Sequence, residues 1–187
     1  MTASNPARTV QSLPYGAWPS PVTAEMLTES PPGVLEPGDN GQVPMWVESR
    51  PQEKGRYVLV TGTPDGPLDL TPEPFNVRNR VHEYGGGSWA ADGDLVVFAN
   101  FADNRLYQLD GIGNEPRPIT PEGGYRFGDL QLDRVSDRIV CVREDHTDSA
   151  LEPVNTIVAL DLDGPNEEGG TILVSGGDFV SSPRLSR

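Results

Sequence analysis

The stretch GSWAADGDLVVFANFADNRLYQLD, residues 87–110, decides the fold because it contains three β-type runs separated by short turns. The runs GSWAA, DLVVFAN and RLYQLD are rich in aliphatic, β-branched and aromatic residues, which strands favour. Asp92-Gly93 is a typical hairpin turn, and ADN at residues 102–104 supplies the next turn. A further short run, PRPITP, follows at residues 116–121. This order predicts an antiparallel meander of strands.

The same order of runs occurs before and after this stretch. The earlier runs are WVE at 46–48, RYVLVTG at 56–62 and PLDLTP at 67–72; the later ones are DLQLD at 129–133, SDRIVCVRE at 136–144, NTIVALDLD at 155–163 and GTILVSG at 170–176. Alignment on the last run of each cycle makes Thr71, Thr120 and Ser175 equivalent, with spacings of 49 and 55 residues. Such spacings are close to the roughly 40–50 residues of a four-stranded propeller blade.

The sequence therefore predicts an all-β protein: a partial β-propeller of about three four-stranded blades. The run SSPRLS at residues 181–186 is interpreted as the start of a further blade. We expect residues 41–187 to form this incomplete β-propeller and residues 1–40 to form an N-terminal extension with a short helix and loops. The helix is predicted at residues 22–28, with Ser20 as its cap.

Composition and charge restrict the class of protein. The 21 Gly, 19 Pro and 35% hydrophobic residues are typical of a turn-rich β protein. The formal net charge of −14 repels phosphate groups, so we expect no nucleic acid and no membrane as partner. The single cysteine, Cys141, excludes an internal disulfide and a cysteine-based zinc cluster. Because no signal peptide and no membrane-spanning stretch is recognised, we expect a cytoplasmic location.

The run RVHEYGGGSW, residues 80–89, contains the most reactive-looking side chains. A zinc site of the H-E-x-x-H type needs a second histidine where this run has glycine, so we expect no metal. On a strand, Arg80, His82 and Tyr84 would share one face, opposite Glu83, and we take these three as candidate substrate-channel residues. The three glycines are interpreted as a close passage of an innermost strand, with a ligand-contacting wall as the alternative.

We predict no catalytic residue in this chain and expect no cofactor. Cys141 lies in an apolar run and is expected to be a buried, inert thiol, while His146 is expected to be a solvated turn residue. The segment DLDGPNEE at 161–168 lacks the ligand pattern of a calcium loop and is interpreted as a hairpin turn. Aromatic patches at 46–48 and 125–127 fit either peptide binding or the stapling of neighbouring strands.

Six segments in this order resemble a known family. They are YGAWPSPVTAEMLT at 15–28, WVESRPQEKGR at 46–56, LTPEPFNVRNRVHEYGGGSW at 70–89, FANFADNRLYQLD at 98–110, CVREDH at 141–146 and SSPRLS at 181–186. Together they resemble the N-terminal β-propeller of the prolyl oligopeptidase family of serine peptidases, in the branch of dipeptidyl aminopeptidases and acylaminoacyl-peptidases. The resemblance covers nearly the whole chain from about Ser12 onward.

The resemblance implies a propeller that caps a C-terminal α/β-hydrolase domain, which carries the catalytic Ser, Asp and His. It implies that the propeller admits peptides and excludes folded proteins, and that its inner loops help to bind the substrate. The chain ends at Arg187, where relatives continue, so we expect truncation before the hydrolase domain and no activity of this chain alone. The expected function is a propeller fragment that gates and helps bind peptides, which meet the enzyme through the missing hydrolase domain.

Two rival interpretations come from other classes of protein. The alternative is a non-enzymatic β-propeller module for protein binding, although the chain lacks the Trp-Asp and double-glycine repeats of WD and kelch proteins. A TolB-like periplasmic propeller is disfavoured because no signal peptide is recognised. About three blades cannot close a ring, so we also expect self-association through the open blade edges.

Overall fold

The computed structural model describes residues 12–28, 32–148 and 152–186, and the chain forms two compact units, Met1–Ser30 and Pro31–Arg187. The first unit contains helix α1, Ala24–Thr28. Thr23 is its cap, because Thr23 Oγ1 accepts the N–H of Met26 at 3.2 Å. Ser20, the predicted cap, instead accepts the N–H of Val22 at 3.0 Å, before the helix begins.

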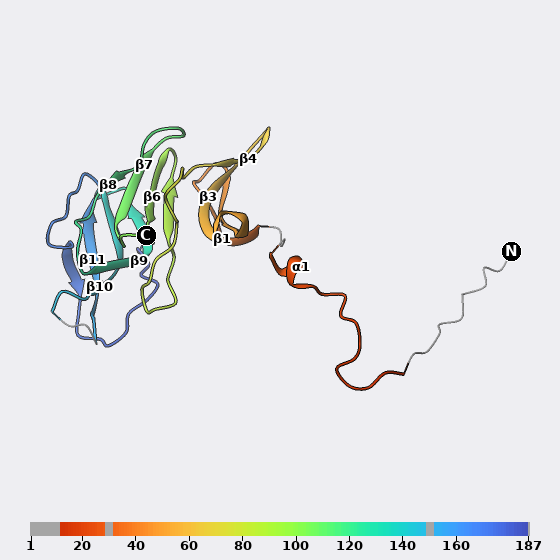
Figure 1. Cartoon of the computed structure of the whole chain (residues 1–187). Coiled ribbons are helices and arrows are strands. Elements are labelled where there is room, and N and C mark those ends of the chain that lie inside the picture. Colours follow the sequence, from red (N-terminus) through yellow and green to blue (C-terminus); the bar gives the residue numbers. More distant parts are fainter. Residues whose placement is uncertain (1–11, 29–31, 149–151, 187) are drawn as a thin grey trace. The chain divides into compact units, whose positions relative to one another are not determined.

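The second unit contains three four-stranded sheets, each a meander in which consecutive strands pair antiparallel (Figure 1). The first sheet has β1 (Gly33–Asp39), β2 (Pro44–Arg50), β3 (Arg56–Thr63) and β4 (Gly66–Asp69), with the 3-10 helix η1 (Pro51–Glu53) between β2 and β3. The second has β5 (Trp89–Asp92), β6 (Leu95–Ala99), β7 (Leu106–Asp110) and β8 (Arg117–Pro118). The third has β9 (Tyr125–Asp133), β10 (Arg138–Asp145), β11 (Val154–Asp161) and β12 (Thr171–Val174). The all-β class and the partial propeller are confirmed.

Two boundaries differ from the sequence prediction. Strand β1 lies inside the segment 1–40 that was assigned to the extension. Its glycines and Pro37 are typical of a loop, and the segment is a strand because it pairs with β2. Residues 175–186, which include the run predicted to start a further blade, contain no strand in the structure. Their backbone is instead held by individual hydrogen bonds, such as the one from the Ser182 N–H to Asp129 Oδ2 at 2.7 Å.

The predicted equivalence of Thr71 and Thr120 is visible in their hydrogen bonds. Each hydroxyl is buried after the fourth strand of its sheet and accepts a backbone N–H from the third strand: Thr71 from Leu59 at 3.0 Å and Thr120 from Leu106 at 2.9 Å. The third member, Ser175, is exposed and lies beyond β12. The repeat therefore has a chemical basis, since a buried hydroxyl satisfies an N–H that the short outer strand leaves unpaired.

The hydrophobic core lies between successive sheets, and β6 belongs to both of its halves. Val96 and Phe98 pack toward the first sheet, whereas Val97 and Ala99 pack toward the third. A strand that is covered on both faces needs apolar residues at every position, which explains the continuous run LVVFA. Cys141 is fully buried in the half between the second and third sheets.

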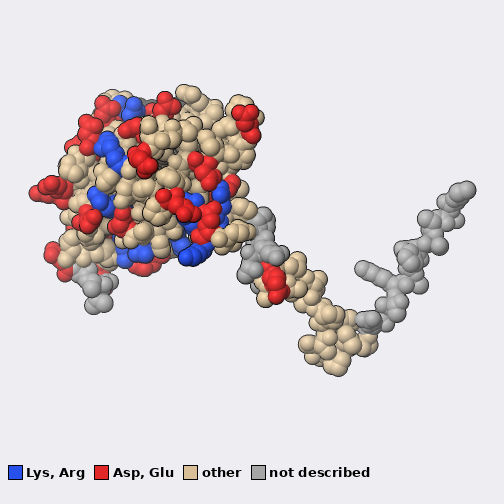
Figure 2. All heavy atoms as spheres, turned by 45° about the horizontal axis from the view of Figure 1, so that its top comes forward, with Lys and Arg blue, Asp and Glu red and all other residues tan. Residues whose placement is uncertain are grey.

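Charged groups are distributed over the surface. Figure 2 shows carboxylates over the visible face with basic groups interspersed among them, in keeping with the net charge of −14. Within the described segments, no helix is both long and apolar enough to cross a bilayer.

Candidate functional site

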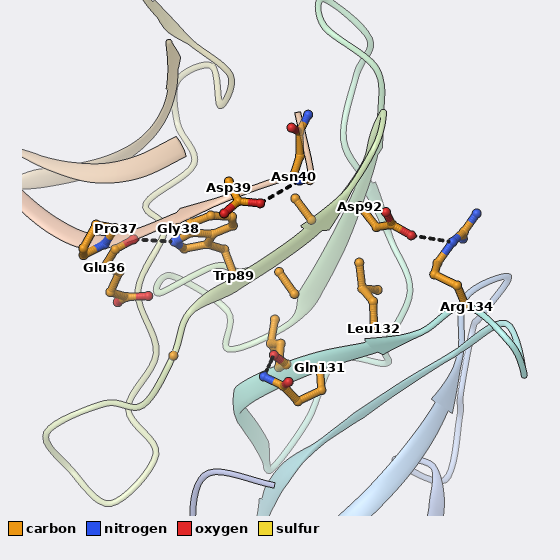
Figure 3. Close-up of a pocket in the computed structure, with 15 residues that line it drawn as sticks. Glu36, Pro37, Gly38, Asp39, Asn40, Trp89, Asp92, Gln131, Leu132 and Arg134 are labelled. Atoms are coloured by element: carbon orange, nitrogen blue, oxygen red, sulfur yellow. Dashed lines mark hydrogen bonds and ion pairs between the residues drawn. The ribbon is translucent and has the colours of Figure 1, made fainter. Parts of the chain in front are cut away.

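The first strands of the three sheets together line a cavity of about 540 Å³. Its wall is formed by residues of β1, β5 and β9, together with Arg134 after β9 (Figure 3). Trp89 is its main aromatic side chain: its Nε1 donates to the carbonyl oxygen of Glu36 at 3.2 Å, and its ring packs on Gly38. A Cβ at Gly38 would lie 2.9 Å from the Trp89 ring, so only glycine admits this contact. In a closed propeller the first strands face the central channel, so this cavity lies on the side that would face such a channel.

The charge of this wall is mainly negative. Glu36, Asp39 and Asp92 line it with Arg134, whose Nε lies 3.3 Å from Asp92 Oδ2 (Figure 3). Glu36 Oε2 accepts the N–H of Ser88 at 2.8 Å and its hydroxyl at 2.9 Å, which ties β1 to the start of β5. Burial raises the pKa of the Glu36 carboxyl, the two bonds from Ser88 oppose this shift, and the charge of Asp129 adds to it.

The strands β1 and β9 each contain a bulge with an acidic residue. The register between β1 and β2 shifts after Leu35, and Glu36 has a φ of 44°. The register between β9 and β10 shifts between Val140 and Val142, where Asp129 has a φ of 54°. Each bulge turns its carboxylate toward the residues just before β5: Glu36 bonds Ser88, and Asp129 bonds Gly87. An extra residue in a strand re-aims the side chains around it.

Asp129 explains why the middle position of the run at 85–87, Gly86, is a glycine. The N–H of Gly87 donates to Asp129 Oδ1 at 2.8 Å, and the N–H of Asp129 donates back to the Gly87 carbonyl oxygen at 2.8 Å. A Cβ at Gly86 would lie 2.7 Å from Asp129 Oδ1. The predicted close passage of the chain is therefore present, and its neighbour is the bulge of β9.

None of the three candidate residues, Arg80, His82 and Tyr84, lines the cavity. Residues 81–84 form a turn in which His82 and Glu83 have φ values of 56° and 65°, so the strand alternation on which the grouping rested is wrong. The His82 side chain is only 4% exposed, whereas Tyr84 is 72% exposed; their rings lie 5.8 Å apart. The turn is closed by a backbone hydrogen bond from the Gly85 N–H to the Val81 carbonyl oxygen at 2.8 Å, which the sequence pattern did not predict.

The turn brings both histidines to one buried carboxylate, Glu144 at the end of β10. Glu144 Oε1 accepts the backbone N–H of His82 at 2.7 Å and lies 3.3 Å from His82 Nδ1. Glu144 Oε2 lies 3.3 Å from His146 Nε2 and 3.8 Å from Arg126 Nη1. Arg126 also pairs with Glu83 at 2.7 Å, which holds the pKa of the exposed Glu83 carboxyl below its ordinary value. His146 is thus a partner of Glu144 and not the solvated turn residue that was expected.

The other ring nitrogen of His82 contacts the segment after β12. His82 Nε2 lies 3.0 Å from the carbonyl oxygen of Val180, and the His82 ring stacks on Phe179 with centroids 3.8 Å apart. Both ring nitrogens of His82 therefore lie close to oxygen atoms, those of Glu144 and of the Val180 carbonyl group. Sequence reasoning missed Glu144 and Phe179 as partners of His82; the one available signal was that CVREDH belongs to the segments with a family resemblance.

The remaining predicted chemistry is limited. Cys141 is buried, and burial raises the pKa of its thiol, as expected for an inert cysteine. Residues 161–168 lie in the connection between β11 and β12, as the hairpin interpretation predicted. The aromatic patches lie on β2 and β9, where Trp46 Nε1 donates to Glu48 at 2.9 Å. Across the residues with described positions, no group of three His, Cys, Asp or Glu side chains is arranged to hold a metal ion.

Comparisons with known proteins identify similar solved structures. No family model and no curated protein matches the chain. A Mycobacterium tuberculosis puromycin-hydrolyzing peptidase is 36% identical with a TM-score of 0.80, over 94% of this chain and 29% of that one. A puromycin hydrolase is 37% identical with a TM-score of 0.80, and a mutant of puromycin hydrolase in complex with PGG is 35% identical with a TM-score of 0.81; each match covers 95% of this chain and 30% of that one.

The chain thus spans about 30% of the length of the peptidases that it matches. The resemblance to the N-terminal β-propeller of the prolyl oligopeptidase family, expected from the sequence, is confirmed by this similarity of fold and sequence.

Proposed function

We propose that this chain is the propeller segment of a serine peptidase-like hydrolase, where it gates the access of peptides and helps to bind them. The observation that carries the proposal is the similarity to puromycin-hydrolysing peptidases over 94% or more of the chain, at 35–37% identity. The proposal includes a cytoplasmic location, which cell fractionation would test.

The channel wall supports the gating role. Three first strands, with Trp89 and the bulged Glu36 and Asp129, are fixed to one another by hydrogen bonds of 2.8–3.2 Å. A wall that is held by such bonds between sheets does not open without breaking several of them together. Narrow, flexible peptides would pass along it, whereas folded proteins would not.

We further propose that the catalytic residues belong to another part of the same protein. In the segments whose structure is described, the hydrogen-bond partners of His82 and His146 are Glu144 and the carbonyl oxygen of Val180, and not a serine or cysteine nucleophile. Nucleophilic catalysis requires such a pairing, with the histidine as general base.

The decisive experiment examines the natural protein that contains this chain. We expect the reading frame beyond codon 187 to encode a G-x-S-x-G motif, and the complete protein to hydrolyse aminoacyl chromogenic substrates and short peptides but not a folded protein of the same composition. A serine-directed inhibitor should abolish this activity, and the 187-residue chain alone should show none.

Two outcomes would contradict the proposal. A stop codon at this point without a hydrolase partner would favour a non-enzymatic binding module. Equal hydrolysis of short peptides and of a folded protein by the complete protein would remove the gating role and leave only the family relationship.

A further inference from the structure

Arg80 shares its side of the chain with Arg78, and not with His82 and Tyr84. In the segment VRNRV, residues 77–81, Val77, Asn79 and Val81 are buried, whereas Arg78 is exposed and Arg80 is half-buried. Alternate side chains of an extended segment project to the same side. The two arginines therefore leave the segment together, away from the core.

Two aromatic rings hold these arginines in place. The guanidinium carbon of Arg78 lies 5.3 Å from the ring centroid of Tyr57 and 4.9 Å from that of Phe101. The guanidinium carbon of Arg80 lies 4.1 Å from the Phe101 centroid. Cation–π contacts use the face of the aromatic ring, so the N–H groups of both guanidinium ions remain able to donate hydrogen bonds.

Among the described residues, neither arginine forms an ion pair with a carboxylate, although the chain carries a net charge of −14. The charge of Arg80 contributes, as the weakest of several causes, to the lowered pKa of Glu83. Within the described segments, the arginines that form ion pairs with Asp or Glu are Arg50, Arg56, Arg105, Arg117, Arg126, Arg134, Arg138 and Arg143. Arg78 and Arg80 stand apart from this set together with Arg184, and Glu83, the carboxylate nearest along the chain, is already paired with Arg126. The guanidinium groups of Arg78 and Arg80 both contact the ring of Phe101, so their positive charges repel each other, and a bound anion would reduce this repulsion.

We propose that Arg78 and Arg80, positioned by Tyr57 and Phe101, form a binding site for a peptide carboxylate. A carboxylate presents two oxygens in a plane and matches the fork of N–H donors on a guanidinium group. The site adjoins the turn at 81–84, because Arg80 directly precedes it in the sequence. The carbonyl oxygen of Arg80 accepts a hydrogen bond from Arg126 Nη1 at 3.2 Å. The inference rests on the proposed function only in taking a peptide as the ligand.

The carboxylate has two sources, a peptide C-terminus and an Asp or Glu side chain, and three labelled probes distinguish them. These are the peptide Ala-Gly-Ala-Gly as the free acid, the same peptide as the C-terminal amide, and the amide with one alanine replaced by glutamate. Fluorescence anisotropy of the 187-residue chain at low salt gives their affinities, with circular dichroism as the check of folding. We expect the acid to bind about tenfold more tightly than the amide, with the preference weakening as salt is added.

The variants localise the effect. Arg78→Gln with Arg80→Gln should abolish the preference for the acid, and Arg184→Gln is the control that removes the same charge from an arginine outside the site. Phe101→Leu keeps both charges but removes the ring that positions them, and should reduce the preference without abolishing it. If the glutamate peptide binds like the acid, the site accepts a side-chain carboxylate as well as a C-terminus; if it binds like the amide, the site accepts only the C-terminus.

Equal binding of acid and amide by the native chain, no binding of any probe, or an unchanged preference in the double variant would overturn the inference. Its failure is separate from that of the proposed function, because binding is measured without hydrolysis. A complete protein that lacks peptidase activity while this chain still prefers the acid would refute only the proposed function. The reverse result would refute only the carboxylate site.

Discussion

Replacing Gly86 by alanine should destabilise the contact between the glycine run and the bulge of β9. The added Cβ would lie 2.7 Å from Asp129 Oδ1, 3.1 Å from Asp129 Cγ and 3.4 Å from the Asp129 backbone nitrogen. A flexible side chain could move aside, but this carboxylate is fixed at both oxygens: Oδ1 accepts the Gly87 N–H at 2.8 Å and Oδ2 accepts the Ser182 N–H at 2.7 Å. The substitution therefore breaks at least the first of these bonds.

The expected loss follows from that bond. A hydrogen bond to a charged group contributes about 1.5–3 kcal/mol, and the partly buried Gly87 N–H would lose its partner. We expect Gly86→Ala to lower the free energy of unfolding by about 2 kcal/mol, measured by urea denaturation with far-ultraviolet circular dichroism. Gly177→Ala is the matched control, because its Cβ would make only ordinary contact, 3.6 Å from Val180, and the change should stay within about 0.5 kcal/mol.

A double-mutant cycle tests the stated cause. In an Asp129→Gly background the obstructing carboxylate is absent, so Gly86→Ala should then cost less than about 0.5 kcal/mol. The reasoning is refuted if Gly86→Ala leaves stability unchanged in the native background, or if its cost is the same with and without Asp129.

Three further predictions concern the repeat, the channel wall and the open sheets. Thr71→Val and Thr120→Val should each lower the free energy of unfolding by about 1–3 kcal/mol, because each leaves a buried N–H unpaired; no change in either would contradict the repeat geometry. The pKa of Glu36 is raised in the folded state, so the stability that the protonated carboxyl contributes is lost as the pH rises above about 4.3, where an unfolded glutamate titrates. In urea titrations, the free energy of unfolding of Glu36→Gln relative to that of the native chain should therefore increase over that range. A difference that does not change with pH would contradict the assignment. The chain should self-associate in size-exclusion chromatography, and Ile172→Lys on the exposed strand β12 should shift it toward monomer; a monomeric native chain would remove this expectation.

The strands were largely predictable because their signals are local. The run RYVLVTG at 56–62 was predicted as a strand from its β-branched and aromatic residues, and it forms β3, Arg56–Thr63. Strand β1 was missed because its burial is low and its glycines and proline resemble a loop. Its strand character comes from pairing with β2, which a local pattern does not report.

The candidate site was predictable only in part. The glycine run was expected to be a close passage of an innermost strand; the close passage is present at Gly86, but the run precedes β5 and is not itself in a strand. The identity of that segment was not predictable, because Gly87 and its partner Asp129 are 42 residues apart. The same holds for His82 and Glu144, which are 62 residues apart in sequence, although the His82 backbone N–H donates to Glu144 Oε1 at 2.7 Å.

The sequence by itself determined the order of the strands from β2 to β12, the apolar character of β6 and the negative net charge. The packing of the sheets decided which side chains meet. The left-handed φ values of His82 and Glu83 are unfavourable for an isolated segment, and contacts such as that between the His82 N–H and Glu144 offset their cost. That turn separates Arg80 from His82 and leaves it beside Arg78 on Phe101, an arrangement that exists only when the sheets are packed.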